Sequence, residues 1–425
     1  MIALSGLRGV GKTTLAWQTA AYVYQSHVKQ IFFLSVDELK WLNAGLYEAF
    51  QALEQVLGRP LHELTQPIML IIDEVHEAQG WQRDLKILYE KAKKVFVLVT
   101  GSSALLLHSS ADLASRWTLT KVFPFRFPEF IVAKTWISGH DPIRFPVRGL
   151  ARELRNAFFF AYDYQDAKQV LIRMHDKIDD YFEDIRQITN KSIKELIDEY
   201  ISYHNIARFV PITNKTLVIE RVLALFERIL LKDIPELHPG HSQVYNRILF
   251  RLALSDTINY QTLSKEFNIK QAEVEKIINS LHQAEILNVF LPHGSVRAKT
   301  GKLIKPFFMS PSLRRALYSR IYGDKLAADL RAKLYEDTLA MYLKRTLSQG
   351  IVSFGFGKKK NPDFVVETMD RPVLVEVGSG QKTGSQIKTY DHYRYGMIVR
   401  AALDQPKFDD PNRIIFIPLK WFLLI

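Results

Sequence analysis

The chain has 425 residues, of which 47% are hydrophobic and 24% charged, a composition typical of a globular protein with several domains. It has no cysteine, which excludes disulfides, thiol catalysis and cysteine-ligated zinc, and its formal net charge is +12. No apolar stretch reaches the ~18 residues of a membrane-spanning helix, and the N-terminus does not resemble a signal peptide. We therefore expect a cytoplasmic protein with no membrane partner.

A glycine-rich loop follows the apolar segment 2–5. Residues 6–14 read Gly-Leu-Arg-Gly-Val-Gly-Lys-Thr-Thr, which fits the phosphate-loop pattern G-x-x-x-x-G-K-[ST] between a strand and a helix. Such a loop turns backbone N–H groups and the helix N-terminus toward phosphates. Lys12 would reach the outer phosphates and Thr13 would hold Mg²⁺. We predict ATP binding by Gly6, Leu7, Arg8, Gly9, Val10, Gly11, Lys12, Thr13 and Thr14.

Apolar runs alternate with helical patterns through the first third of the chain, as in an α/β domain with a parallel sheet. The expected strands are 2–5, 31–34, 68–72, 95–100 and 118–122, and the expected helices are 15–24, 39–57 and 85–92. The continuous apolar run 68–72 predicts a strand buried on both faces. It leads directly into Asp73 and Glu74.

Asp73 and Glu74 are expected at the edge of the sheet where ligands bind in open α/β folds. Asp73 would support the Mg²⁺ shell, and Glu74 would orient or deprotonate the attacking water. Such a pair can otherwise be a charge pair at a helix N-terminus. The phosphate loop upstream favours the catalytic interpretation.

Two further segments of the chain hold candidates for the same site. Strand 95–100 ends in Thr-Gly-Ser-Ser, so Thr100, Ser102 and Ser103 can each sense the outer phosphate, and the sequence does not choose between them. Arg116 is a candidate arginine finger for a neighbouring subunit's nucleotide. The alternative for Arg116 is a surface ion pair.

Four motifs in this order resemble the prokaryotic and archaeal AAA-type P-loop ATPases. They are Gly-Leu-Arg-Gly-Val-Gly-Lys-Thr-Thr-Leu, Ile-Ile-Asp-Glu-Val-His, Thr-Gly-Ser-Ser and Phe-Pro-Phe-Arg-Phe-Pro-Glu-Phe, within residues 6–130. The most similar subgroup carries a winged-helix module and a C-terminal nuclease-like domain. The resemblance implies an AAA-like core in which Lys12, Thr13, Asp73 and Glu74 have the roles given above.

The middle of the chain is predicted to be helical and then to form a winged helix-turn-helix. Apolar residues at helical spacing predict a packed helix face: Leu171, Met174, Ile178, Tyr181, Phe182 and Ile185. Four expected elements suggest the winged helix: a short helix within 260–269, a longer helix carrying Val274 and Leu281, and strands 287–291 and 304–309. The longer helix has acidic outward positions and no arginine, so we expect a structural or non-specific role rather than base reading.

Residues 291–345 hold twelve lysines and arginines against four acids, a local net charge of +8. This stretch can attract the phosphate backbone of DNA or RNA, or it can be a solvated basic face. The wing residues Arg297, Lys299, Lys302 and Lys305 are the expected phosphate contacts.

The last hundred or so residues resemble the core of PD-(D/E)xK nucleases. Glu336 lies on a predicted helix, and Asp363 and Glu376 lie at the ends of two predicted strands. The resemblance implies that these three carboxylates bind a metal ion and that a lysine two residues after the Glu positions the attacking water. Gly378 stands in that place. Lys382, Gln386 or Lys388 can replace the lysine, or the domain is an inactive partner module.

We predict four domains: an ATPase core (1–137), a helical lid or insertion (138–239), a winged helix (240–322) and an α/β nuclease-like domain (323–425). The first hypothesis is a Mg²⁺-dependent ATPase that couples nucleotide state to the other domains and acts on nucleic acid. An arginine finger at Arg116 would require a homo-oligomer. The second is a nucleotide-gated switch or scaffold for protein partners with an inactive nuclease-like domain, which Gly378 favours.

Overall fold

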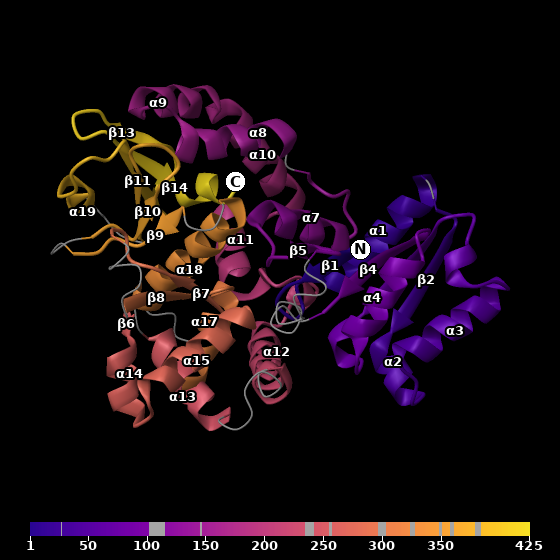
Figure 1. Cartoon of the computed structure of the whole chain (residues 1–425). Coiled ribbons are helices and arrows are strands. Elements are labelled where there is room, and N and C mark those ends of the chain that lie inside the picture. The colour runs from indigo at the N-terminus through magenta and orange to yellow at the C-terminus, as the bar shows by residue number, and fades with distance from the viewer. Residues whose placement is uncertain are drawn as a thin grey trace. The chain divides into compact units, whose positions relative to one another are not determined.

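The computed structural model describes most of the chain (Figure 1). The described residues are 1–26, 28–101, 115–144, 147–233, 242–254, 257–295, 303–323, 328–347, 351–357, 361–378 and 384–425. None of the helices in these ranges is long and apolar enough to cross a lipid bilayer.

The chain divides into two compact units. Unit 1 comprises Met1–Phe123, Arg228–Gly240 and Gln283–Glu285, and unit 2 comprises Pro124–Glu227, His241–His282 and Ile286–Ile425. The N-terminal part of unit 1 thus ends at Phe123, before the domain boundary that the sequence predicts after residue 137. The division into four domains stays a prediction.

Unit 1 is built on a five-stranded sheet of the order β2-β3-β4-β1-β5, in which every pair is parallel. The strands are β1 (Ile2–Ser5), β2 (Gln30–Ser35), β3 (Ile68–Asp73), β4 (Val95–Thr100) and β5 (Thr118–Lys121). All five lie where the sequence predicts strands. The α/β core with a parallel sheet is therefore confirmed.

Helices cover both faces of this sheet. They are α1 (Lys12–Ser26), α2 (Val36–Trp41), α3 (Leu46–Leu57) and α4 (Trp81–Lys91). In β3 alternate residues enter two separate apolar clusters, one with residues of α2, α3 and α4 and the other with α1. This explains why the run 68–72 has no polar residue.

The single helix predicted over 39–57 is wrong in one respect, because α2 and α3 are separate helices. Asn43 has a φ of 54°, in the left-handed region that an α-helix cannot contain. Gly45 then caps the start of α3, and its backbone N–H donates a hydrogen bond to Glu48 Oε2 at 2.9 Å.

Unit 2 begins with helices. They are α7 (Phe127–Ile137), α8 (Val147–Arg155), α9 (Tyr164–Arg173), α10 (His175–Thr189), α11 (Ile193–Glu199) and α12 (Lys215–Arg228). The apolar stripe predicted from Leu171 to Ile185 is buried on α9 and α10, with Met174 between them. Its interpretation as packed core is confirmed.

The two helices and two strands expected for the winged helix are present in the expected order: α14 (Tyr260–Phe267), α15 (Gln271–Gln283), β7 (Leu287–Phe290) and β8 (Leu303–Phe308). Helix α13 (Ser242–Ala253) and strand β6 (Ile258–Asn259), which the sequence analysis does not predict, precede them. The strands form an antiparallel sheet of the order β6-β8-β7. The identity of this region as a winged helix stays a prediction.

The C-terminal region contains a six-stranded mixed sheet of the order β13-β14-β12-β11-β10-β9. The elements are α17 (Pro311–Tyr322), α18 (Ala328–Thr346), β9 (Val352–Ser353), β10 (Phe364–Val366), β11 (Val373–Gly378), α19 (Ser385–Lys388), β12 (Tyr395–Arg400), β13 (Lys407–Asp409), β14 (Ile414–Pro418) and α20 (Leu419–Phe422). Helix α18 contacts both β8 and β11 and therefore joins the two sheets of unit 2.

The motif Phe-Pro-Phe-Arg-Phe-Pro-Glu-Phe anchors the start of unit 2. The Phe127 N–H donates to Tyr342 Oη at 2.7 Å. The guanidinium of Arg345 in α18 donates to both carboxylate oxygens of Glu129, at 2.6 and 2.7 Å. Burial alone would raise the pKa of Glu129, but its contacts with Arg345 and Arg126 together outweigh burial and leave the pKa below its usual value.

Replacement of Glu129 by glutamine should lower the stability of unit 2 at pH 7 by about 1–2 kcal/mol, because a bidentate, partly exposed ion pair is lost. Since the folded-state pKa is depressed, this contribution is present above the unfolded pKa of about 4.3 and disappears as the pH falls through the folded value. Thermal unfolding followed by circular dichroism at pH 7 and at pH 3 measures both effects.

The exposed Glu220 of α12 provides a matched control, because Glu220→Gln removes the same charge from the surface of the same unit. An equal loss of stability for Glu129→Gln at pH 7 and pH 3 would contradict a stabilising ion pair between Glu129 and Arg345. So would a loss at pH 7 no larger than that of the control.

Candidate nucleotide site and carboxylate cluster

The phosphate loop joins β1 to α1, and its glycines have backbone angles that other residues rarely adopt. Gly9 and Gly11 have φ values of 84° and 98°. A Cβ atom on Gly6 would lie 2.3 Å from the carbonyl oxygen of Val122, so a side chain there would clash with the backbone. The loop geometry thus explains the glycine pattern read from the sequence.

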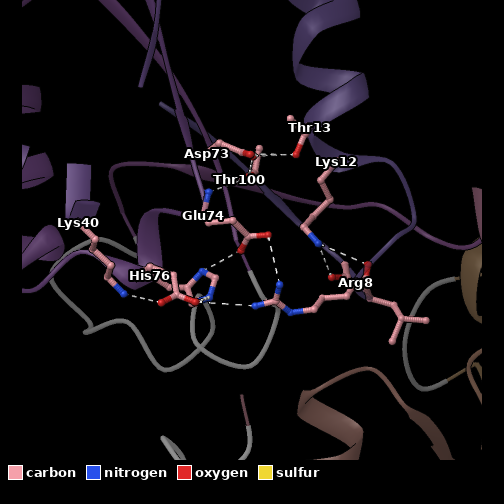
Figure 2. Close-up of polar contacts among 11 residues, drawn as sticks. Arg8, Lys12, Thr13, Lys40, Asp73, Glu74, His76 and Thr100 are labelled. Carbon is pink, nitrogen blue, oxygen red and sulfur yellow. Dashed lines mark hydrogen bonds and ion pairs between the residues drawn. The ribbon is translucent and has the colours of Figure 1, made fainter. Parts of the chain in front are cut away.

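Lys12 begins α1 and folds back over the loop (Figure 2). Its Nζ donates to the carbonyl oxygens of Gly6 at 2.9 Å and Leu7 at 3.4 Å. Burial lowers the pKa of Lys12, and the nearby carboxylate of Glu74 opposes this shift. A buried ammonium group that faces the loop is suited to an anionic ligand such as a phosphate.

Asp73 is the last residue of β3, and its carboxylate contacts side chains of α1 and β4. Thr13 Oγ1 donates to Asp73 Oδ1 and Oδ2, at 2.9 and 3.1 Å. Thr100 Oγ1 also donates to Asp73 Oδ1, and it accepts the Glu74 N–H at 3.1 Å. The structure thus brings together the hydroxyl and carboxylate that the sequence assigns to Mg²⁺, which prefers such oxygen ligands.

Glu74 follows β3 and has a φ of 54°, an unusual value for a residue with a side chain. Its carboxylate lies 4.0 Å from Arg8 Nη1 and 3.4 Å from His76 Nδ1. The arrangement holds the carboxylate beside the loop through side chains that come from the loop and from the turn after β3.

The other predicted residues of this site have different outcomes. Ser102 and Ser103 lie outside the described residues. Thr100 is buried and in contact with Asp73 and Glu74, as given above. The Arg116 Nη2 lies 2.9 Å from Glu90 Oε1 in an ion pair, the alternative that the sequence leaves open, and the finger role of Arg116 stays a prediction.

Sequence reasoning missed the side chains that surround Glu74. Arg8 is predicted only as a loop residue, and His76, Glu77 and Lys40 are not predicted for this site. The local string Asp-Glu-Val-His-Glu could have suggested His76 and Glu77, which follow Glu74 on the short turn η2 (Val75–Glu77). No sequence pattern connects Lys40 in α2 to this turn.

The nuclease-like carboxylates of unit 2 lie beside a lysine. Lys305 Nζ of β8 is 3.0 Å from Glu336 Oε2 and 3.6 Å from Asp363 Oδ1. Asp363 Oδ2 accepts the Val377 N–H at 2.9 Å, so Asp363 lies next to the strand that carries the buried Glu376. Among the described residues, no three His, Asp or Glu side chains are grouped closely enough to hold a metal ion.

This cluster corrects the prediction that Lys305 contacts nucleic acid from the wing. Lys305 is buried, and its ion pairs with two carboxylates offset the cost of burying its charge. Of the replacement groups proposed from the sequence, Lys382 lies outside the described residues. Lys388 Nζ lies 3.8 Å from Asp409 Oδ2. The metal role of Glu336, Asp363 and Glu376 stays a prediction.

The basic stretch is less exposed than its sequence suggests. Arg314 and Arg315 are both 2% exposed. Arg314 donates to the buried Asp337 at 2.6 and 2.9 Å and to the Ala253 carbonyl oxygen at 2.9 Å. Part of the positive charge of the stretch 291–345 is therefore buried inside the protein. Arg297, Lys299 and Lys302 lie outside the described residues.

Comparison with known proteins supports the nucleotide-binding core. A family model described as AAA domain matches residues 1–131. An uncharacterized protein of Methanocaldococcus jannaschii is 26% identical over 436 residues, which cover 100% of this chain and 85% of that protein. An uncharacterized protein of Haemophilus influenzae is 28% identical over 137 residues, 31% of this chain and 33% of that protein.

Among solved structures, domain III of the Thermotoga maritima replication initiation protein DnaA matches with 16% identity and a TM-score of 0.24, covering 46% of this chain and 81% of that chain. The family match over residues 1–131 confirms the predicted AAA-type core. The winged-helix and nuclease-like assignments stay predictions.

Proposed function

We propose that this protein binds and hydrolyses ATP at the site in unit 1. The observation that carries the proposal is the contact of Thr13 with Asp73, 2.9 Å between Thr13 Oγ1 and Asp73 Oδ1. These residues are 60 positions apart in the sequence and are the two that the loop pattern and the strand pattern independently assign to Mg²⁺. A bound Mg²⁺ would neutralise charge on the outer phosphates.

The remaining side chains fit the parts of a phosphoryl-transfer site. The loop glycines and the start of α1 offer backbone N–H groups to phosphates, and Lys12 adds a buried positive charge. Glu74 is the general base or orients the attacking water. Thr100 positions both acids, because it contacts the Asp73 carboxylate and the Glu74 N–H.

Two variants test this proposal. Lys12→Ala should remove ATP binding, because the buried ammonium group is lost. Glu74→Gln should keep binding and lower turnover by at least about 100-fold, since a general base contributes about 10²–10⁴. Fluorescent-nucleotide titration and phosphate release measure binding and turnover separately.

The exposed Lys94 of the same unit supplies the control variant Lys94→Ala, which should bind and turn over ATP as the wild type does. Wild-type turnover in both Lys12→Ala and Glu74→Gln would overturn the assignment.

We further propose that nucleotide state biases the helical, winged-helix and nuclease-like parts during action on DNA or RNA in the cytoplasm. The order of α14, α15, β7 and β8 supports the winged helix, and the high net charge supports a polyanionic partner. Nucleotide can drive such a change only if it binds the alternative arrangements with different affinity. A homo-oligomer is part of this proposal if Arg116 acts in trans.

A gel-shift series with duplex DNA, single-stranded DNA and RNA tests the nucleic-acid partner. Binding should weaken steeply as salt rises from about 50 to 200 mM, because phosphate contacts release counterions. No shift of any of the three at low salt would remove nucleic acid as the partner.

The second candidate function is a nucleotide-gated scaffold that binds protein partners. The position of Lys305 favours it, because the ammonium group lies between two of the carboxylates that a metal ion would need. The cation already compensates Glu336 and Asp363, so a metal ion would have to displace it. Gly378, in place of the lysine that the nuclease resemblance implies, also favours an inactive domain.

Lys305→Met should therefore bind Mn²⁺ at least about tenfold more tightly than the wild type, because it leaves the partly buried carboxylates of Glu336 and Asp363 without their cation. Calorimetric titration of the full chain with Mn²⁺ measures this affinity, with Lys407→Met, at an exposed position of β13, as the control. Mg²⁺-dependent cleavage of DNA or RNA by the wild type, lost in Asp363→Ala, would contradict the scaffold and support an active nuclease. Cleavage that persists in Asp363→Ala would come from a contaminant.

A further inference from the structure

Two glutamates and three cationic or ionisable partners form a network beside the phosphate loop. It consists of Arg8, Lys40, Glu74, His76 and Glu77. The side chains of His76 and Glu77 are 2% and 4% exposed, and that of Arg8 is 12% exposed. Burial makes charge compensation in this network energetically important.

Arg8 links the loop to both glutamates (Figure 2). It projects from the loop between Gly6 and Gly11, and its Nη1 and Nη2 lie 4.0 Å from Glu74 and 3.8 Å from Glu77. Charge-assisted hydrogen bonds of a guanidinium group are normally about 2.7–2.9 Å long. Arg8 therefore contacts the two carboxylates at the outer limit of an ion pair.

The other partners of the glutamates hold them more closely. Lys40 Nζ lies 2.5 Å from Glu77 Oε2. His76 Nδ1 lies 3.4 Å from Glu74, and its Nε2 lies 3.8 Å from Glu77. If the guanidinium group of Arg8 moved away, Lys40 would still compensate Glu77 and His76 would still contact Glu74.

A phosphate at the loop would compete for Arg8. The loop backbone is shaped for phosphates, and the Arg8 side chain starts from its centre. A phosphate group offers several charged oxygens in the bidentate geometry that a guanidinium group prefers. Its contacts with Arg8 can be shorter than those observed with Glu74 and Glu77.

We propose that Arg8 distinguishes a nucleoside triphosphate from a diphosphate, by exchanging its contacts with Glu74 and Glu77 for the terminal phosphate. The inference rests on the proposed nucleotide site. The exchange removes the Arg8 cation from the Glu74 carboxylate, while His76 continues to contact that carboxylate. Binding of a triphosphate and the availability of the base are therefore coupled through one side chain.

The test compares the affinities of ATP and ADP for the full-length wild type, Arg8→Ala and Arg8→Lys. Arg8→Ala should weaken ATP binding about 10- to 100-fold, which is the loss expected when one charge-assisted contact is removed. It should change ADP binding less than about threefold. Arg8→Lys should restore part of the ATP preference, because it keeps the charge but not the bidentate geometry. Arg59→Ala removes an exposed arginine of the same unit and should change neither affinity.

A variant of His76 separates the role of Arg8 from that of His76. His76→Gln should lower kcat and leave the ratio of ATP to ADP affinity at the wild-type value, because His76 Nδ1 lies 3.4 Å from Glu74, the proposed base. Equal weakening of ATP and ADP by Arg8→Ala, or no change in either, would overturn the inference while the nucleotide site stands. If the wild type binds neither nucleotide, the proposed function itself fails.

Discussion

The nucleotide site depends on the geometry of a buried parallel sheet. Because β1, β3 and β4 are parallel and in fixed register, their carboxyl ends meet at one edge. This edge places the phosphate loop, Asp73 and Thr100 together although they are far apart in the sequence. The Asp73 carboxylate then accepts hydrogen bonds from Thr13 and Thr100, so any shift in strand register would separate the groups that form the site.

Charge compensation inside the protein is a second recurring feature. Glu77 faces Lys40 and Arg8 in unit 1, and Arg314 faces Asp337 in unit 2. Removal of one member of such a pair leaves the other buried and uncompensated, which is costly. Internal pairing explains why a stretch with a strong positive charge in the sequence does not form a basic surface along its whole length.

The sequence predicted those features of the fold and site that depend on local backbone patterns. The glycines of the loop, the apolar run before Asp73 and the alternation of strands and helices each follow from short-range periodicity or from φ requirements. The AAA-type core was predictable for this reason. The break between α2 and α3 was missed, because one left-handed residue, Asn43, interrupts a continuous helical pattern.

Long-range pairing of side chains was not predictable. Lys305 was assigned to a surface wing, but packing of β8 near α18 places it against Glu336 and Asp363. The aromatic motif ending at Phe130 was assigned to the ATPase core, yet Glu129 pairs with Arg345 of unit 2, more than 200 positions away. Spacing along the chain carries no information about such partners, because tertiary packing decides them.

Thr13 and Asp73 are the residues proposed to bind Mg²⁺ for ATP hydrolysis. The most direct measurement is the Mg²⁺ dependence of ATP turnover by the full-length wild type and by Asp73→Ala. Turnover should require Mg²⁺ in the wild type and should be lost in Asp73→Ala at every Mg²⁺ concentration, with thermal stability measured in parallel to show that the variant is folded. Equal turnover of the two proteins, or wild-type turnover that persists in excess EDTA, would contradict this role of Thr13 and Asp73.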